Sequence, residues 1–193
     1  MGYSLSWLAV KDVDIDKILQ ELQMERTDSA GEYYRNGPPC YLDMNNGWHL
    51  VSFGWQDILT ESAPLLERLS LLGDVVAVFV EESNMVSSAG GWKNGSRRWL
   101  VSHELDLGDA HLETSGEMPE CFDSVLAKTK ADTEKAAAAK SKFKCDYYFD
   151  IPVQIGYRMV GFLHDRDVSG LDLDAFVELK PAGNKRKFAS LKR

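Results

Sequence analysis

The stretch DVVAVFVEESNMVSSAGGWKNGSRRWLVSHEL, residues 74–105, decides the fold class. It opens with Asp74–Glu82, whose centre is wholly apolar and rich in β-branched residues, as is typical of a central strand buried on both faces. Asn94-Gly95 is the clearest turn signal in the chain and predicts that Met85–Trp92 pairs with Arg97–Leu105 as a hairpin. The stretch therefore predicts part of a mostly antiparallel sheet.

Three more strands are expected in the N-terminal part of the chain. The first ten residues alternate in side-chain character, with Tyr3, Leu5, Trp7 and Ala9 on one face, which predicts a strand with at least one buried face. Asn46-Gly47 predicts a tight turn between strands at Cys40–Met44 and Trp48–Phe53. These two strands would form a second hairpin.

Two helices and a loop are expected between these strands. Asp14 is a typical N-cap, and the apolar residues after it recur at helical spacing. Leu59–Leu72 carries leucines at helical spacing and predicts a second helix, with Gly73 as its C-cap. Glu25–Pro39 is polar and contains several Gly, Asn and Pro residues, so we expect a long surface loop there.

The C-terminal part of the chain predicts a strand, two helices and a final strand. Asp109–Thr114 is the strand candidate, and a helix is expected over Pro119–Phe143. Its second half, Lys128–Lys144, has high helix propensity but few large apolar side chains, so we expect it to protrude. A helix with an Asp N-cap is expected over Asp150–Gly161, followed by a strand over Leu171–Leu179.

Hairpins dominate this order, so the expected fold is a single α+β domain, residues 1–179, with helices packed on a mostly antiparallel sheet. Residues 180–193 are expected to form a basic C-terminal tail. No apolar run approaches the roughly 18 residues that a membrane span needs, and the N-terminus lacks a signal-peptide pattern. The cysteines, Cys40, Cys121 and Cys145, are odd in number and far apart, which favours free thiols and a cytoplasmic location.

Charge is unevenly distributed along the chain. Residues 1–179 hold 16 basic and 30 acidic residues, whereas residues 180–193 hold six basic residues and no acidic one. An acidic body argues against nucleic acid as its partner, because affinity for phosphates comes from clustered Lys and Arg. It favours a basic protein partner, which it would attract electrostatically. Neither a membrane nor a cofactor is expected as a ligand.

The sequence contains no dinucleotide-binding, phosphate-binding, nucleophile-elbow or zinc-protease motif. The remaining catalytic candidates are two His-carboxylate pairs, His103-Glu104 after a strand and His164-Asp165 after a helix. If the two pairs met, they could bind a metal or act as general acid and base. A small hydrolase is therefore an alternative reading, although no metal site is predicted from spacing alone.

Three segments resemble a known class of proteins. They are the opening YSLSWLAV, residues 3–10, the stretch from Val80 through VEESNMVSS to WLVSH103, and the segment DYYFDIP, residues 146–152, with GFLHD at 161–165. Together they resemble uncharacterised bacterial proteins of the toxin-immunity type. The resemblance implies a small cytosolic protein without a cofactor, which blocks a basic toxin with an acidic surface.

The leading expectation is therefore an immunity protein that occludes the active site of a basic toxin domain. The expected contacts surround the central hairpin, with Trp92 as an apolar anchor beside the acidic residues Glu81, Glu82, Asp106 and Asp109. Trp55, just past a strand, is the other tryptophan that could reach the surface, although for each of the two the sequence favours burial in the core. An adaptor or structural subunit that docks through the Lys- and Ala-rich helix is a further alternative.

Overall fold

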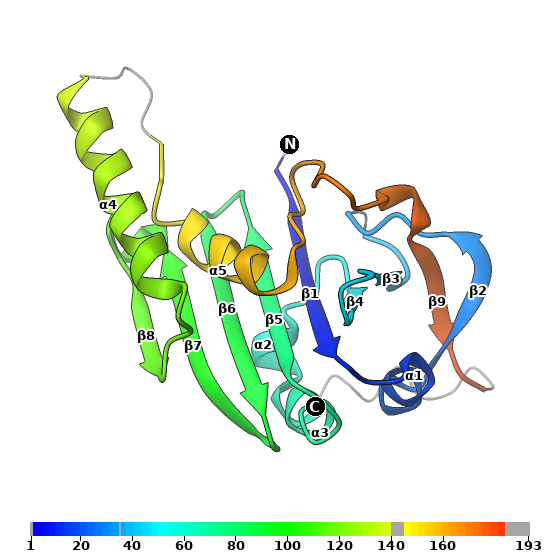
Figure 1. Ribbon diagram of the computed structural model, residues 1–193. Coiled ribbons are helices and arrows are strands. Elements are labelled where there is room, and N and C mark those ends of the chain that lie inside the picture. Colours follow the sequence, from blue (N-terminus) through cyan, green and yellow to red (C-terminus); the bar gives the residue numbers. More distant parts are fainter. Residues whose placement is uncertain (1, 35, 140–144, 184–193) are drawn as a thin grey trace.

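The computed structural model describes residues 2–34, 36–139 and 145–183, and its strands form one sheet (Figure 1). The strand order is β2-β9-β3-β4-β1-β5-β6-β7-β8, and all neighbours pair antiparallel. The prediction of a single α+β domain is confirmed. The strands are β1 (Ser4–Lys11), β2 (Met24–Ala30), β3 (Cys40–Asp43), β4 (Trp48–Ser52), β5 (Val75–Glu81), β6 (Val86–Lys93), β7 (Ser96–Glu104), β8 (Glu113–Gly116) and β9 (Val177–Pro181).

The central strand is β1, which lies between β4 and β5. Its alternation is as predicted, because Leu5 and Trp7 enter the core on one face, while Leu8 and Val10 enter the core on the other. Burial on both faces explains why β1 and β5 are almost free of charged side chains. The predicted hairpin around residues 94–95 is also confirmed, since both turn residues have positive φ, 53° and 75°, as a two-residue hairpin turn requires.

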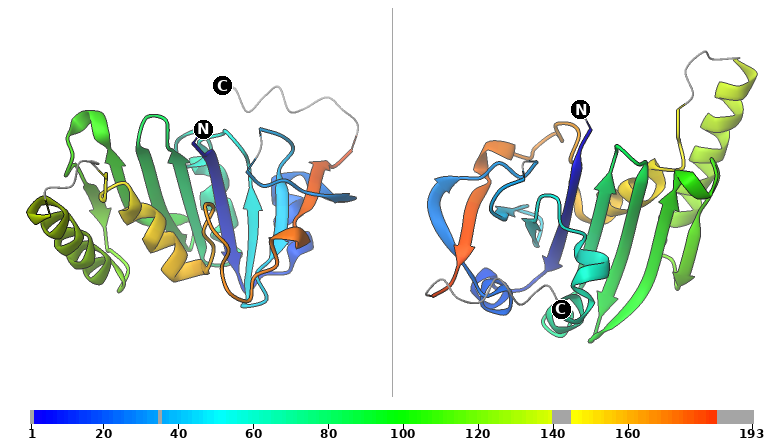
Figure 2. Two further views of the ribbon diagram at one scale, coloured as in Figure 1. Left: turned by 90° about the horizontal axis from the view of Figure 1, so that it is seen from above. Right: turned by 180° about the vertical axis from the view of Figure 1, so that it is seen from behind.

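Helices cover both faces of the sheet (Figure 2). Three helices pack against one face of the sheet and share a core cluster with it, and two helices cover the other face. The first group is α1 (Ile15–Leu22), α2 (Ile58–Glu61) and α3 (Ala63–Leu69), and the second is α4 (Phe122–Ala138) and α5 (Asp150–Val160). Asp14 caps α1 as predicted, accepting a hydrogen bond from the Asp16 amide. No helix in the described ranges is long and apolar enough to cross a membrane.

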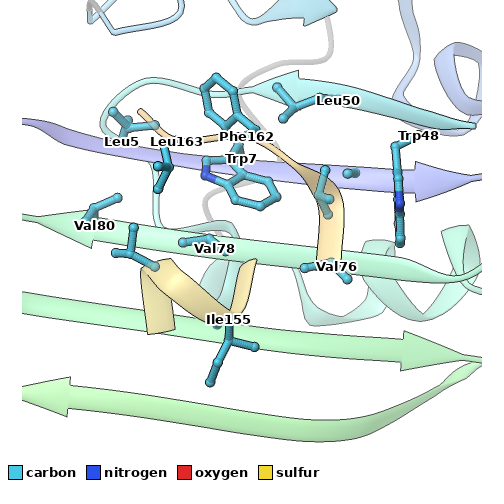
Figure 3. Close-up of a cluster of buried hydrophobic side chains, with 14 of the residues drawn as sticks. Leu5, Trp7, Trp48, Leu50, Val76, Val78, Val80, Ile155, Phe162 and Leu163 are labelled. Carbon is cyan, nitrogen blue, oxygen red and sulfur yellow. The ribbon is translucent and has the colours of Figure 1, made fainter. Parts of the chain in front are cut away.

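The core under α5 is built around Trp7 (Figure 3). Phe162 meets the Trp7 ring edge-on, with ring centroids 5.6 Å apart, a favoured aromatic geometry. Gly156 lets α5 approach β5 closely: a Cβ placed there would lie 2.6 Å from Val78 Cγ2 and 3.1 Å from the Trp7 ring. Contact between α5 and the sheet therefore depends on the missing side chain.

Replacing Gly156 with alanine is expected to lower the free energy of unfolding by up to about 2 kcal/mol, because overpacking a rigid core costs about 1–3 kcal/mol. This cost outweighs the gain in helix propensity, about 1 kcal/mol. Urea denaturation at constant m-value measures the change. Gly37→Ala is the matched control, since a Cβ at Gly37 has nothing within 4 Å. An equal or higher stability of Gly156→Ala than of the native protein would contradict the close approach.

The expected loop at Glu25–Pro39 is wrong in its first part. Residues 24–30 form β2, which pairs with β9, Arg26 lying opposite Leu179. Glu25 Oε1 also lies 3.2 Å from the ammonium of Lys180. β2 is an edge strand whose side chains are mostly exposed, so it carries no apolar alternation, and its pairing partner lies some 150 residues away in the chain.

The expected helix at Leu59–Leu72 is two short helices. α2 ends at Glu61, because the φ of the next residue, Ser62, is −131° and not helical. α3 then begins with Pro64 in its first turn. Proline has no amide hydrogen to donate and clashes with the preceding turn, so the helix cannot run through it. Gly73 is not the C-cap, a position taken by Ser70. A Cβ at Gly73 would lie 2.3 Å from the Lys11 carbonyl, so glycine permits close backbone contact there.

Other C-terminal boundaries shift. The strand expected over Asp109–Thr114 is present as β8 but lies later, at Glu113–Gly116. The helix α5 begins at Asp150 itself, with Phe149 in the cap position. Residues 173–175 form a 3-10 turn before β9. Because Lys180 lies within β9, the domain extends past residue 179; residues 184–193 of the expected tail lie outside the described residues.

The helix α4 protrudes as predicted, since its C-terminal end extends beyond the sheet (Figure 1). Its buried residues are Val125 and Thr129, both in its first half. The end expected at Phe143 lies outside the described residues. This polar helix stands beside the end of the sheet at which the candidate site is built.

Candidate functional site: the acidic end of the sheet

Four segments meet at one end of the sheet, the upper end in Figure 1. We call residues 81–85, 104–113, 145–150 and 164–168 the acidic end, because they contain ten Asp or Glu residues and one Arg. They meet because β5 and β7 end there, while β6, β8 and α5 begin there. Hydrogen bonds join them: the Leu105 amide donates to the Met85 carbonyl (3.2 Å), and Ser87 Oγ donates to the Phe149 carbonyl (2.7 Å).

His103 is the buried centre of the acidic end. Its side chain is 0% exposed, and its Nε2 lies 2.7 Å from Oδ2 of Asp146, whose side chain is 8% exposed. Its Nδ1 lies 2.7 Å from the backbone carbonyl of His111. Both ring nitrogens therefore have a hydrogen-bond partner within the protein. The arrangement is a buried imidazole held by acceptors on both sides.

Asp146 links this imidazole to the start of α5. Its other oxygen, Oδ1, accepts hydrogen bonds from the backbone amides of Tyr148 and Phe149, both at 3.2 Å. It thereby satisfies amides that precede the helix, as an N-terminal capping residue does. The His103–Asp146 pair is therefore a strut that fixes the start of α5 against β7.

His164 is the second buried histidine, and it lies against the start of β1 and the end of β5. It is 3% exposed, its Nε2 lies 3.4 Å from Glu82 Oε1, and the Tyr3 ring meets it edge-on at 5.2 Å. Its Nδ1 is buried without a hydrogen-bond partner among the described residues. Burial lowers the pKa of His164, against the opposing effects of Asp165 and Glu82.

This burial predicts that wild-type stability falls as the pH drops below the ordinary histidine pKa of about 6.5. In that range the unfolded chain binds a proton at His164 and the native chain does not, so the slope is positive, at most about 1.4 kcal/mol per pH unit. Urea unfolding at several pH values between 7.5 and 5.5, for wild type and His164→Gln, measures it. Carboxylates contribute to both proteins, so parallel curves for the two would refute the assignment.

The two candidate catalytic pairs do not form one site. His103 binds Asp146 and His164 binds Glu82, with β6 between the strands that carry these contacts. Neither histidine binds its neighbour in the sequence: Glu104 is exposed, and Asp165 forms an ion pair with Arg166 at 2.7 Å. Within the described ranges, no three His, Cys, Asp or Glu side chains are grouped to hold a metal ion.

Four of the five expected contact residues lie at the acidic end. Asp106 and Asp109 are exposed, and Glu81 and Glu82 are half-buried. Glu82 has a structural role as well, because its Oε2 accepts a hydrogen bond of 2.8 Å from the Tyr3 amide. Like charges are crowded here: burial, and then Asp165 and Asp146, raise the pKa of Asp150.

Trp92 is not an exposed anchor, and that expectation is wrong. The residue is 3% exposed and belongs to the core that faces α1–α3. Its ring lies over Gly90, where a Cβ would be 2.7 Å from the ring, and it stands at the end of β6 remote from the acidic end. Trp55, for which the sequence favours burial, is exposed, at 62%. The exposed apolar side chain at the acidic end is instead Leu107, at 61%.

A pocket of about 430 Å³ opens at the acidic end, between α4 and the ends of β6 and β7. Met85 and Leu105 line it from the sheet, Ala136 and Ala137 from α4, and residues 145–148 from the segment before α5. Its walls are mainly apolar, although Asp109 and Asp146 also line it. No sequence motif indicates this pocket, because its walls come from three parts of the chain.

Comparisons of the chain with models of protein families, with curated proteins and with solved structures found no match. The protein is therefore described by its own fold and site. It is an α+β domain with a nine-stranded antiparallel sheet, and acidic side chains, two buried histidines and a pocket lie at one end of that sheet.

Proposed function

We propose that the protein binds a basic protein partner through its acidic end and neutralises it, as an immunity protein neutralises a toxin. The observation that carries the proposal is the meeting of ten acidic residues with a single arginine in four segments at one end of the sheet. Such a field attracts a basic surface, speeds encounter and selects against acidic partners.

The resemblance to proteins of the toxin-immunity type supports the same surface. Two of the resembling segments, residues 80–88 and 146–152, lie at or next to the acidic end. A partner that acts on a polyanionic substrate has a basic active site, and acidic side chains seated on it would keep the substrate out. Exposed Leu107 would supply an apolar contact within this charged surface, as interfaces combine an apolar centre with a polar rim.

Affinity capture from a lysate of the protein's own cells at low salt tests this proposal. The bait proteins are wild type, Glu104→Lys/Asp106→Lys at the acidic end, and Glu61→Lys/Glu67→Lys on the helices of the opposite face. All four substituted residues are exposed. Each double variant replaces two carboxylates with two lysines, so both variants make the same change in net charge. We expect one basic protein at near-equal stoichiometry with wild type and with the opposite-face control.

Loss of that partner from Glu104→Lys/Asp106→Lys alone would support the acidic end as the binding surface. Capture of no stoichiometric basic partner, or equal capture by all three baits, would contradict the proposal. Glu81 and Glu82 are left unchanged because Glu82 also holds Tyr3 and His164, so that its reversal would disturb the fold.

A further inference from the structure

We propose that the pocket at the acidic end receives an arginine side chain of the basic partner, an inference that rests on the proposed function. The pocket, about 430 Å³, lies within the range of about 300–1,000 Å³ typical of ligand sites. It is therefore large enough for one long side chain and part of the backbone that carries it. Its position between α4 and the ends of β6 and β7 places such a side chain within the acidic end.

The walls of the pocket suit a side chain with an apolar stem. Met85 and Leu105 form one side, and the small side chains of Ala136 and Ala137 form the other. Arginine carries three methylene groups that can cover such surface while its charged head remains near polar groups. A lysine has a similar stem, so the stem alone does not select arginine.

The aromatic residues of the pocket select arginine over lysine. Tyr147 and Tyr148 line the third side, and a guanidinium stacks on aromatic faces and is less strongly hydrated than an ammonium. The Asp146 carboxylate is already occupied by His103 and the start of α5. Charge complementarity therefore comes from the exposed carboxylates of the acidic end, such as Glu104 and Asp106.

A wholly apolar side chain fits the proposal less well. It would fill the same volume, but it would gain nothing from the negative field around the pocket mouth. A basic partner presents arginines in any case, and arginine is among the residues that carry most binding energy at protein interfaces. Charge and wall chemistry thus indicate the same occupant.

Three capped tripeptides test the inference without the partner: acetyl-Ala-Arg-Ala-amide, its citrulline analogue, which is neutral and nearly the same shape, and its lysine analogue. Methyl signals of Ala136, Ala137 and Met85 are followed by NMR on the full chain during titration. We expect saturable shifts with the arginine peptide, binding at least about tenfold weaker with the lysine peptide, and no saturation with the citrulline peptide.

Two variants complete the test. Ala136→Trp fills the pocket from α4 and should abolish saturation, whereas Ala136→Ser should preserve it; Met85 reports in both, and an unchanged urea midpoint shows that each is folded. Absence of saturation with wild type, equal binding of the citrulline peptide, or unaltered binding to folded Ala136→Trp would overturn the inference. None of these results touches the acidic-end proposal, which the charge-reversed baits test separately.

Discussion

Replacing Glu104 and Asp106 with lysine is expected to slow association with the basic partner by at least about tenfold at low salt. Both side chains are exposed at the acidic end, so the change acts on the long-range field that steers encounter, an effect worth about 10- to 1,000-fold in rate. Dissociation should change less, because exposed charges act mainly on encounter. Stopped-flow measurement of the association rate constant at several salt concentrations checks this.

The matched control for this prediction is Glu61→Lys/Glu67→Lys, which makes the same change in net charge on α2 and α3. At physiological ionic strength its association rate should remain within about twofold of wild type, because the Debye length is then about 8 Å. At 1 M salt the acidic-end variant and wild type should associate at similar rates. Equal slowing by both variants would show that net charge alone, and not the acidic end, governs the encounter.

Replacing Asp146 with alanine is expected to lower the free energy of unfolding by about 3–5 kcal/mol, the cost of breaking a buried pair by removing one partner. The change leaves the Nε2 of His103, which is 0% exposed, without its partner. It also leaves the amides of Tyr148 and Phe149 without their acceptor at the start of α5. Urea denaturation followed by circular dichroism measures the loss.

Asp132→Ala on α4 is the matched control, because it removes a carboxylate from an exposed ion pair with Lys128. Such pairs contribute about 0–1 kcal/mol. The double variant His103→Leu/Asp146→Ala should recover part of the lost stability, since it removes both members of the buried pair. A loss below about 1 kcal/mol for Asp146→Ala would mean that the strut does not hold α5.

Local patterns were sufficient to predict the centre of the fold. Because β1 and β5 are buried on both faces, their sequences are almost free of charged residues, and this pattern predicts central strands. Asn94-Gly95 fixes the adjacent hairpin through its own backbone preferences. The pairing of β2 with β9 has no comparable pattern in the sequence. β2 is a polar edge strand, and it pairs with a segment some 150 residues away.

The candidate site was predictable only in part. Its charge could be read from the sequence, since Glu81, Glu82, Asp106 and Asp109 do lie together at the acidic end. The choice of Trp92 as an exposed anchor failed, because the register of β6 and β7 shifts at a bulge next to it, so that simple alternation does not give its face. The position of Asp146 shortly before a predicted helix indicated a capping role. No local sequence pattern indicated that it would pair with His103.

Hydrogen-exchange footprinting of the complex with the captured basic partner tests the central claim most directly. The proposal predicts slower exchange on binding in residues 104–113 and 145–150, with smaller changes in residues 81–85 and 164–168. Amides of α1 and α3, on the opposite face, should exchange at the same rate in the free and bound protein. Protection confined to those helices or to the β2–β9 edge, with the acidic end unchanged, would contradict the claim.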